Sequence, residues 1–166
     1  MENRTPKIKV LFVCLGNICR SPSAEAVTKA YCEKSGLSKL IECDSAGTIG
    51  YHAGEPAYHK MRQHGLKRGY NLTSISRQIK PNDFMDFDYI IGMDDDNLRN
   101  MQTFMPSLEI KKKISKMTDY CAKPNPGYVP DPYYGGSKEF EQVLDILEDA
   151  CSGLITHICK EKGINL

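Results

Sequence analysis

A short apolar segment near the start of the chain constrains the fold more than any other feature. Residues 7–14, Lys-Ile-Lys-Val-Leu-Phe-Val-Cys, alternate briefly and then become continuously apolar. A strand without a polar face is buried on both sides, which is typical of a parallel sheet covered by helices. The turn at residues 15–17 ends this strand, and a helix follows at once. The start of the chain therefore indicates an α/β fold.

The order of the later segments supports the same fold class. Ser21 is expected to cap the first helix, with Pro22 at its first helical position. The pattern predicts helices at about 22–36, 55–67 and 137–162, a helix start at 94–96, and strands at 39–45, 87–93 and 113–117. Because strands and helices alternate, we expect an open parallel sheet of about four strands with helices on both faces, flavodoxin-like.

Length and composition narrow the class of protein. The chain has 166 residues, so we expect a single domain spanning residues 1–166. Lys and Arg number 22 against 21 Asp and Glu, a balance without the basic field that nucleic acid binding needs. The longest apolar run, Val10 to Leu15, is too short for a membrane helix, and residues 1–6 lack the apolar core of a signal peptide. A cytoplasmic protein without a membrane or nucleic acid partner is expected.

The cysteines fit that location. There are 7 of them, an odd number without regular spacing. In a reducing compartment they should be mostly free thiols. No pair has Cys-x2-Cys spacing, so no structural metal site is expected.

The loop after the first strand carries the most informative motif. It runs Cys-Leu-Gly-Asn-Ile-Cys-Arg-Ser-Pro from Cys14 to Pro22. Its backbone amides can converge on an anion, and the helix N-terminus adds positive potential. Arg20 can bind two oxygens of a tetrahedral oxyanion, while Cys14 would be held as a thiolate nucleophile. The loop can therefore bind a phosphate and attack it, unless Cys14 is a buried thiol in an ordinary turn with Arg20 at the surface.

Other residues suit this chemistry. Gly16 permits unusual backbone conformations, Asn17 tolerates the left-handed region, and Ser21 could donate its hydroxyl to the thiolate. Hydrolysis of a phosphate monoester also needs an acid for the leaving group. Asp131 is the best candidate, because it lies between two prolines that would hold it stiffly. The alternative is a turn residue, which Asp-Pro often is.

The segment from Val13 to Ala26 resembles the phosphate-binding loop of the low-molecular-weight protein tyrosine phosphatases. The resemblance spans nearly the whole chain in order, through residues 44–48, 76–78, 87–90, 93–94 and 131–135. It implies a phosphotyrosine protein phosphatase that is also an acid phosphatase on small aryl phosphates. It further implies a phosphocysteine intermediate on Cys14, with Arg20 binding the phosphate and Asp131 as general acid and base. No metal or cofactor is implied.

The resemblance also implies roles for residues around the nucleophile. Phosphate, vanadate or sulfate would bind in the loop, and the substrate-binding residues would be Leu15, Gly16, Asn17, Ile18, Cys19, Tyr51, Tyr133 and Tyr134. Asn17, Ser21 and Ser45 would support the loop by hydrogen bonds. A network position that is usually His is held by Ser74, which leaves open how the network is completed. Cys19 would form a protective reversible disulfide with Cys14.

Three other functions remain open at the sequence level. An arsenate reductase would need further cysteines to relay a disulfide, and the chain has none between Cys43 and Cys121. A phosphoarginine phosphatase typically has Thr at the loop position held by Ile18. A non-catalytic phosphotyrosine-binding module would not need a nucleophile, an arginine and an acid together. These residues disfavour each alternative.

Overall fold

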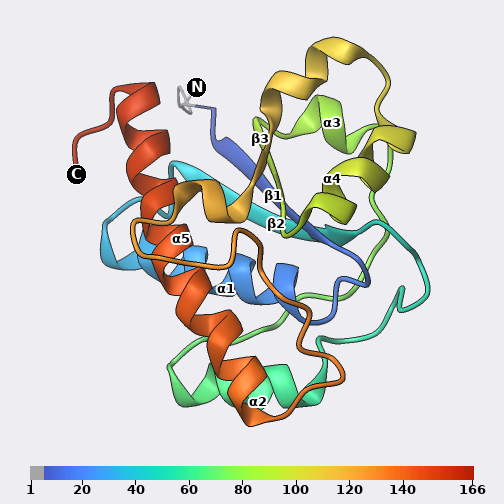
Figure 1. Cartoon of the computed structure of the whole chain (residues 1–166). Helices are drawn as coiled ribbons and strands as arrows, with labels where there is room; N and C mark the ends of the chain where they lie inside the picture. Colours follow the sequence, from blue (N-terminus) through green and yellow to red (C-terminus); the bar gives the residue numbers. More distant parts are fainter. Residues whose placement is uncertain (1–5) are drawn as a thin grey trace.

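Four parallel strands form the centre of the computed structural model, which describes residues 6–166. The strands are β1 (Ile8–Cys14), β2 (Ile41–Gly47), β3 (Tyr89–Gly92) and β4 (Ile114–Lys116), and they lie in the order β2-β1-β3-β4 (Figure 1). This arrangement confirms the predicted open parallel α/β sheet. Residues 1–5, which carry most of the segment without a signal-peptide pattern, lie outside the described residues.

The register of the sheet brings three strand ends together. β1 lies between β2 and β3, and the side chains from Val10 to Cys14 are buried, as the apolar run predicts. Cys14 is paired with Gly47 at the end of β2, and Val13 with Gly92 at the end of β3. In open α/β sheets ligands bind beyond the carboxyl ends of the strands. Cys14 therefore ends β1 at the edge where a site is expected.

Helices cover both faces of the sheet. On one face α1 (Arg20–Lys34) packs against the long α5 (Ser137–Lys162), and α2 (His59–Lys67) also packs against α5 (Figure 1). The other face is covered by α3 (Asp83–Asp86), α4 (Asp95–Met101) and a 3₁₀ helix at Leu108–Lys113. Further 3₁₀ helices span Gln102–Phe104 and Met117–Tyr120. Two hydrophobic clusters, one on each face, form the core.

Several element ends differ from the sequence prediction. α1 begins at Arg20, and the predicted cap Ser21 is wrong because its hydroxyl contacts Cys14 and Asn17 instead. α2 begins at residue 59 rather than 55, because Pro56 pairs with Ile75 in a short antiparallel bridge. β2 lies two residues later than predicted. The short α3 and the 3₁₀ helices carry too few periodic residues to be predicted.

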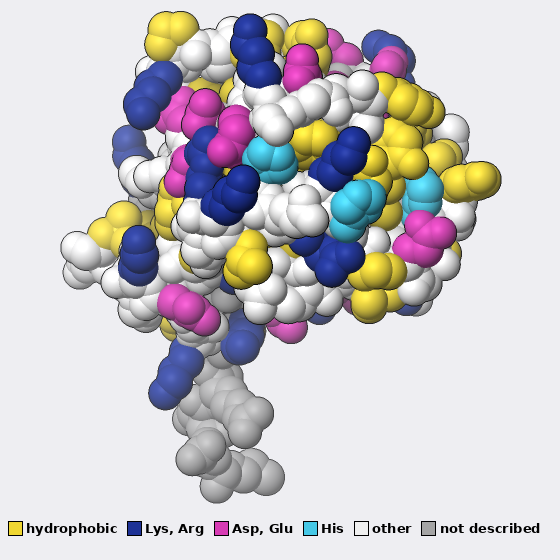
Figure 2. Space-filling view, turned by 90° about the horizontal axis from the view of Figure 1, so that it is seen from below, with side chains coloured by type: hydrophobic (Ala, Val, Ile, Leu, Met, Phe, Trp, Pro, Cys, Tyr) yellow, Lys and Arg dark blue, Asp and Glu magenta, His cyan; other side chains and the backbone are white. Residues whose placement is uncertain are grey.

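Charged side chains of both signs are distributed over the face seen from the α2 end (Figure 2). Hydrophobic and histidine side chains gather on one half of that face (Figure 2). No helix within residues 6–166 combines the length and the apolar character that crossing a membrane requires. The cytoplasmic location stays a prediction.

Candidate active site

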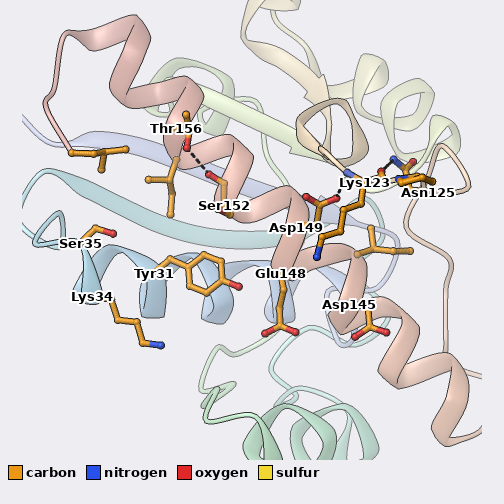
Figure 3. Close-up of a pocket in the computed structure, with 14 residues that line it drawn as sticks. Tyr31, Lys34, Ser35, Lys123, Asn125, Asp145, Glu148, Asp149, Ser152 and Thr156 are labelled. Atoms are coloured by element: carbon orange, nitrogen blue, oxygen red, sulfur yellow. Dashed lines mark hydrogen bonds between the residues drawn. The ribbon is translucent and has the colours of Figure 1, made fainter.

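Two cavities compete as the candidate site. The larger, about 790 Å³, lies between α1, α5 and the loop at residues 123–125 (Figure 3). The smaller, about 400 Å³, opens at the carboxyl end of β1. It is lined by Cys14, Leu15, Gly16, Ile18, Cys19, Arg20, Ile49, Tyr51, His52, Asp131, Tyr133 and Tyr134. Because the candidate nucleophile, arginine and acid line the smaller cavity and not the larger, the smaller is the candidate active site.

Residues 14–19 are here called the anion loop. Hydrogen bonds from other segments to its carbonyl groups hold the backbone of this loop in place. The carbonyls of residues 14–18 accept from four groups: Thr48 N to Cys14 O (2.9 Å), Ile49 N to Leu15 O (3.1 Å), Ser76 Oγ to Gly16 O (3.0 Å) and Tyr58 N to Ile18 O (2.8 Å). In a trans peptide the carbonyl and the following N–H point in opposite directions. Each of these bonds therefore turns the next amide to the opposite side. The result is a nest of N–H donors suited to an anion.

Asn17 sits at the bend of the anion loop. Its φ of 57° lies in the left-handed region, as expected from the sequence. Its side chain points away from the cavity: Nδ2 donates to Ser21 Oγ (2.8 Å), and Oδ1 accepts from Arg77 N (3.0 Å). Ser21 Oγ lies 3.0 Å from Cys14 Sγ. Because Ser21 already accepts from Asn17, its own proton can be donated to the Cys14 sulfur, and Ala46 O lies 3.4 Å from the same hydroxyl.

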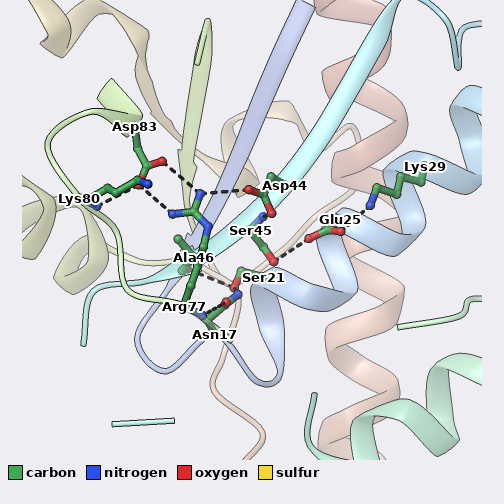
Figure 4. Close-up of polar contacts among 10 residues, drawn as sticks. All are labelled: Asn17, Ser21, Glu25, Lys29, Asp44, Ser45, Ala46, Arg77, Lys80 and Asp83. Carbon is green, nitrogen blue, oxygen red and sulfur yellow. Dashed lines mark hydrogen bonds and ion pairs between the residues drawn. The ribbon is translucent and has the colours of Figure 1, made fainter. Parts of the chain in front are cut away.

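Residues 76–77, which bind the anion loop from outside, are fixed in place by the charged pairs of Arg77 (Figure 4). The guanidinium of Arg77 pairs with Asp83 (2.9 Å) and Asp44 (3.0 Å). These bonds outweigh the effect of burial and raise the pKa of Arg77, so it stays charged. Bidentate arginine–carboxylate pairs fix geometry as well as charge. The pairs hold in place the Arg77 amide that binds Asn17.

Within the described residues, neither the Ser45 nor the Ser74 hydroxyl hydrogen-bonds to the anion loop. Ser45 Oγ donates to Glu25 Oε1 (2.7 Å), and the other oxygen of Glu25 pairs with Lys29 (2.6 Å), as Figure 4 shows. Ser45 therefore ties β2 to α1 rather than contacting the loop directly. The Ser74 hydroxyl is buried and has no hydrogen-bond partner among the described residues.

Gly47 allows the anion loop to approach the end of β2. A Cβ at this position would lie 2.7 Å from Leu15 O and 3.1 Å from Asn17 N. Both neighbours are backbone atoms, so neither could move without deforming the loop. Glycine at the end of β2 is thus part of the site's construction.

Arg20 is buried below the cavity, with 3% of its side chain exposed. Its NH1 donates to Asp94 Oδ2 (2.6 Å) and to Val129 O (3.1 Å), while NH2 lies 3.7 Å from Asp131 Oδ2. Burial acts to lower the pKa of Arg20, but the neighbouring Cys14, Asp94 and Asp131 outweigh burial and raise the pKa. The guanidinium therefore remains a fixed cation beside Cys14.

Asp131 reaches the cavity from the irregular loop before α5. Its side chain is 46% exposed, and Oδ1 accepts from Tyr133 N (3.1 Å). The buried Val129 anchors this loop, since its N–H donates to Met93 O (2.8 Å) and its carbonyl accepts from Arg20. The arginine and the candidate acid are thus positioned by one anchor.

The remaining candidates lie at different depths. Tyr51 and Tyr134 line the mouth and are 83% and 97% exposed, whereas Tyr133 is half-buried against Tyr58, with 4.8 Å between ring centroids. Cys19 is buried at the start of α1. Burial, together with the negative charges of Cys14 and Asp131, raises its pKa far above the usual range. Cys19 therefore stays a protonated thiol, and its redox role stays a prediction.

Comparison with known families places the chain among phosphatases. The family model described as low molecular weight phosphotyrosine protein phosphatase matches residues 9–163. The chain belongs to this family. YfkJ of Bacillus subtilis, a low molecular weight protein-tyrosine-phosphatase, is 40% identical over 158 residues, covering 95% of this chain and 99% of the relative. The human low molecular weight phosphotyrosine protein phosphatase is 37% identical over 147 residues, covering 88% and 92%.

Solved structures agree. A protein tyrosine phosphatase from Entamoeba histolytica, crystallised with Hepes in its active site, superposes with a TM-score of 0.89 at 51% identity, covering 95% of this chain and 99% of that one. The crystal structure of YfkJ gives a TM-score of 0.88 at 38% identity, with 96% and 99% covered. These structures share the fold across almost the full length of this low molecular weight phosphatase.

Some residues of this family member's site were not singled out as site residues from the sequence. Asp94, which binds Arg20, follows β3 at the carboxyl edge of the sheet, and that position was the available signal. His52 lines the cavity and pairs with Glu55 (Nδ1 to Oε2, 2.7 Å); its place beside Tyr51 was the available signal, although a solvated histidine was the favoured interpretation. Ser76 and Glu25 act through contacts distant in sequence, which a single sequence does not reveal.

Within residues 6–166, no three His, Cys, Asp or Glu side chains gather in an arrangement that could hold a metal ion.

Proposed function

We propose that the chain is a phosphotyrosine protein phosphatase that also hydrolyses small aryl phosphates. The observation that carries the proposal is a single cavity lined by Cys14, Arg20 and Asp131, with the buried thiol below and the exposed carboxylate at the mouth. The names of the Bacillus and human relatives support the same substrate class. Hepes, present in the active site of the Entamoeba protein, carries a tetrahedral sulfonate, which supports an oxyanion site here.

In the first step the Cys14 thiolate attacks the phosphorus of the ester. The S–P bond forms as the bond between phosphorus and the phenolic oxygen breaks, and Asp131 gives its proton to that oxygen. Arg20 and the amides of the anion loop hold the non-bridging oxygens, on which charge is concentrated in the transition state. A phosphocysteine and a free phenol result.

In the second step water replaces the sulfur. Asp131, now ionised, takes a proton from a water molecule whose oxygen attacks the phosphorus. The S–P bond breaks, and the electron pair returns to Cys14 as a thiolate. Ser21 stabilises this leaving sulfur through its 3.0 Å contact. Inorganic phosphate is released, and the enzyme is ready for another turnover.

The walls of the cavity favour aryl esters. Tyr133, backed by Tyr58, and Ile18 supply flat or apolar surfaces beside the anion loop. A phenyl ring fits between such walls and lowers its phosphorus toward Cys14. The exposed Tyr51 and Tyr134 extend this surface to the protein that carries the phosphotyrosine.

Hydrolysis of para-nitrophenyl phosphate at mildly acidic pH tests the proposal. We expect turnover that vanadate inhibits and EDTA leaves unchanged. A phosphotyrosine peptide should be hydrolysed faster than phosphoserine or phosphoarginine, and arsenate should not be reduced. Loss of activity on chelation would contradict the metal-free mechanism, and preference for phosphoarginine or arsenate would favour the other chemistries.

The role of Cys14 has its own test. Cys14→Ser should abolish turnover, by about 10³-fold or more, because a serine hydroxyl is a far weaker nucleophile at this pH. Phosphate should still bind, since the amides and Arg20 are unchanged. A Cys14→Ser protein that still turns over would refute the assignment.

A further inference from the structure

Four groups bind the carbonyls of residues 14–18 in the anion loop: three are backbone amides, and the fourth is a side chain. Ser76 Oγ donates to Gly16 O at 3.0 Å. The peptide that joins Gly16 to Asn17 is therefore held by a group that a single substitution can remove.

This peptide has a reason to rotate. Asn17 has a φ of 57°, which is unfavourable for a residue with a side chain. A flip of the Gly16–Asn17 peptide would bring that φ into the ordinary negative region. Gly16 has no Cβ to oppose the accompanying change in ψ. The flip would also turn a carbonyl oxygen toward the cavity, where it would repel a phosphate.

Burial and backbone hydrogen bonds hold Ser76 in the position from which its hydroxyl opposes that rotation. It is 4% exposed, its N–H donates to Glu55 O (2.8 Å), and its carbonyl accepts from Gly54 N (2.9 Å). The next residue, Arg77, donates its amide to the Asn17 side chain and is itself held by Asp83 (Figure 4). The hydroxyl of Ser76 therefore occupies a fixed position relative to the anion loop.

We propose that Ser76 is a positioning residue that keeps the Asn17 amide directed at the substrate's phosphate. The inference rests on the proposed function in one respect, namely that the anion loop binds phosphate. It also answers the question left by Ser74. The Ser74 hydroxyl has no hydrogen-bond partner among the described residues, and Ser76, two positions later, supplies the contact to the loop.

The test compares Ser76→Ala, Ser76→Thr and the matched control Ser74→Ala with the native chain. The inhibition constant for inorganic phosphate and the kcat and KM for para-nitrophenyl phosphate are measured for each. Protection of Cys14 by phosphate against alkylation with iodoacetate, followed by mass spectrometry, measures anion binding without turnover. Thermal unfolding of each variant reports whether the fold itself is affected.

Ser76→Ala should weaken phosphate binding roughly three- to tenfold and lower kcat/KM by a similar factor, the effect of losing one hydrogen bond. Ser76→Thr should restore both, and Ser74→Ala should stay within about twofold of native on the same scale. Unchanged phosphate binding in Ser76→Ala, or equal effects of the two alanine variants, would overturn the inference. So would a loss that Ser76→Thr does not restore.

These measurements distinguish a failure of the proposed phosphatase function from a failure of the role proposed for Ser76. If the native chain hydrolyses no ester, the proposed function fails, while the alkylation assay still decides whether Ser76 controls anion binding. If the native chain is active and Ser76→Ala binds phosphate normally, only the role of Ser76 fails.

Discussion

At the scale of single residues, one guanidinium organises the charges of the site. Arg20 is held by Asp94 and the Val129 carbonyl on one side, which leaves NH2 facing Asp131 and the cavity. A buried arginine without such partners could adopt other rotamers. The orientation of Arg20 therefore depends on a carboxylate that does not line the cavity.

Asp94→Asn tests that dependence. Asp94 also caps α4 by accepting from Asn97 N (2.8 Å), and asparagine caps helices equally well, so the variant removes the charge and keeps the cap. We expect kcat/KM for aryl phosphates to fall about 10- to 100-fold, because Arg20 loses a charge-assisted partner. Thermal unfolding should change little. Native kcat/KM in Asp94→Asn would show that Arg20 is positioned without this carboxylate.

Asp131→Asn separates the acid from the nucleophile. Without a proton donor, a poor leaving group should suffer more than a good one. We expect kcat/KM to fall about 10²- to 10³-fold for phenyl phosphate and considerably less for para-nitrophenyl phosphate. The measurement is kcat/KM across aryl phosphates whose phenols differ in acidity, because kcat/KM reports the first step alone. An equal loss for all of them would rule out Asp131 as the general acid.

The sequence predicts the nucleophile, the arginine and the acid because each belongs to a motif with a chemical purpose. Ser21 shows the limit of this reasoning. Its place before Pro22 is typical of a helix cap, yet its hydroxyl contacts Cys14 and Asn17. Propensity cannot weigh a local cap against a tertiary contact, because the contact exists only after β1 and α1 are placed.

At the scale of elements, the site depends on how closely the anion loop approaches β2. The amide of Gly47, the final residue of β2, also donates to Arg77 O (2.8 Å). This bond joins β2 to the segment at residues 76–77. The sequence predicts β2 but ends it two residues early. Residues with small side chains, such as Ala46 and Gly47, have low strand propensity. Their strand conformation comes from pairing with β1.

Gly47→Ala should therefore damage the site. The added Cβ would meet backbone atoms at 2.7 Å, so the loop must shift by several tenths of an ångström. We expect phosphate affinity and kcat/KM to fall at least about tenfold, with a loss of about 1–3 kcal/mol in stability. Gly50→Ala is a useful control, because its nearest contact is the flexible Gln78 side chain. Equal activity in the two variants would contradict the close-approach argument.

At the scale of the whole molecule, α5 connects distant parts of the chain. Its buried stripe packs on α1 and on the 3₁₀ helix at residues 117–120, and Asp149 accepts from the amides of Ala122 (3.1 Å) and Lys123 (3.0 Å). These bonds fix the start of the loop that later carries Asp131. The sequence predicts α5 well, because a long amphipathic pattern has few alternatives. It could not predict the anchor, because Asp149 lies on the polar side of the helix, where most carboxylates are solvated.

Asp149 gives a pH-dependent prediction. Burial acts to raise its pKa, but the hydrogen bonds from Lys123 and Ala122 outweigh burial and lower it. A carboxyl whose pKa is lowered in the folded state stabilises the fold at neutral pH, and this contribution is lost as pH falls through its folded pKa. Asp149→Asn should therefore have a lower Tm than the native chain at pH 7, and the difference should shrink near pH 3. Glu42→Gln, on the exposed side of β2, serves as the control. A constant difference at all pH values would show that the charge of Asp149 does not contribute.

The backbone bonds that hold the anion loop also bear on how such enzymes can diversify. Amides from two other segments, at residues 48–49 and at Tyr58, bind three of the loop carbonyls, so the shape of the loop depends little on which side chains residues 15 and 18 carry. Those two side chains line the cavity. Exchanging them should alter substrate preference while leaving oxyanion affinity nearly constant. Relatives could therefore change targets by replacing single amino acids at the mouth, without rebuilding the machinery beneath.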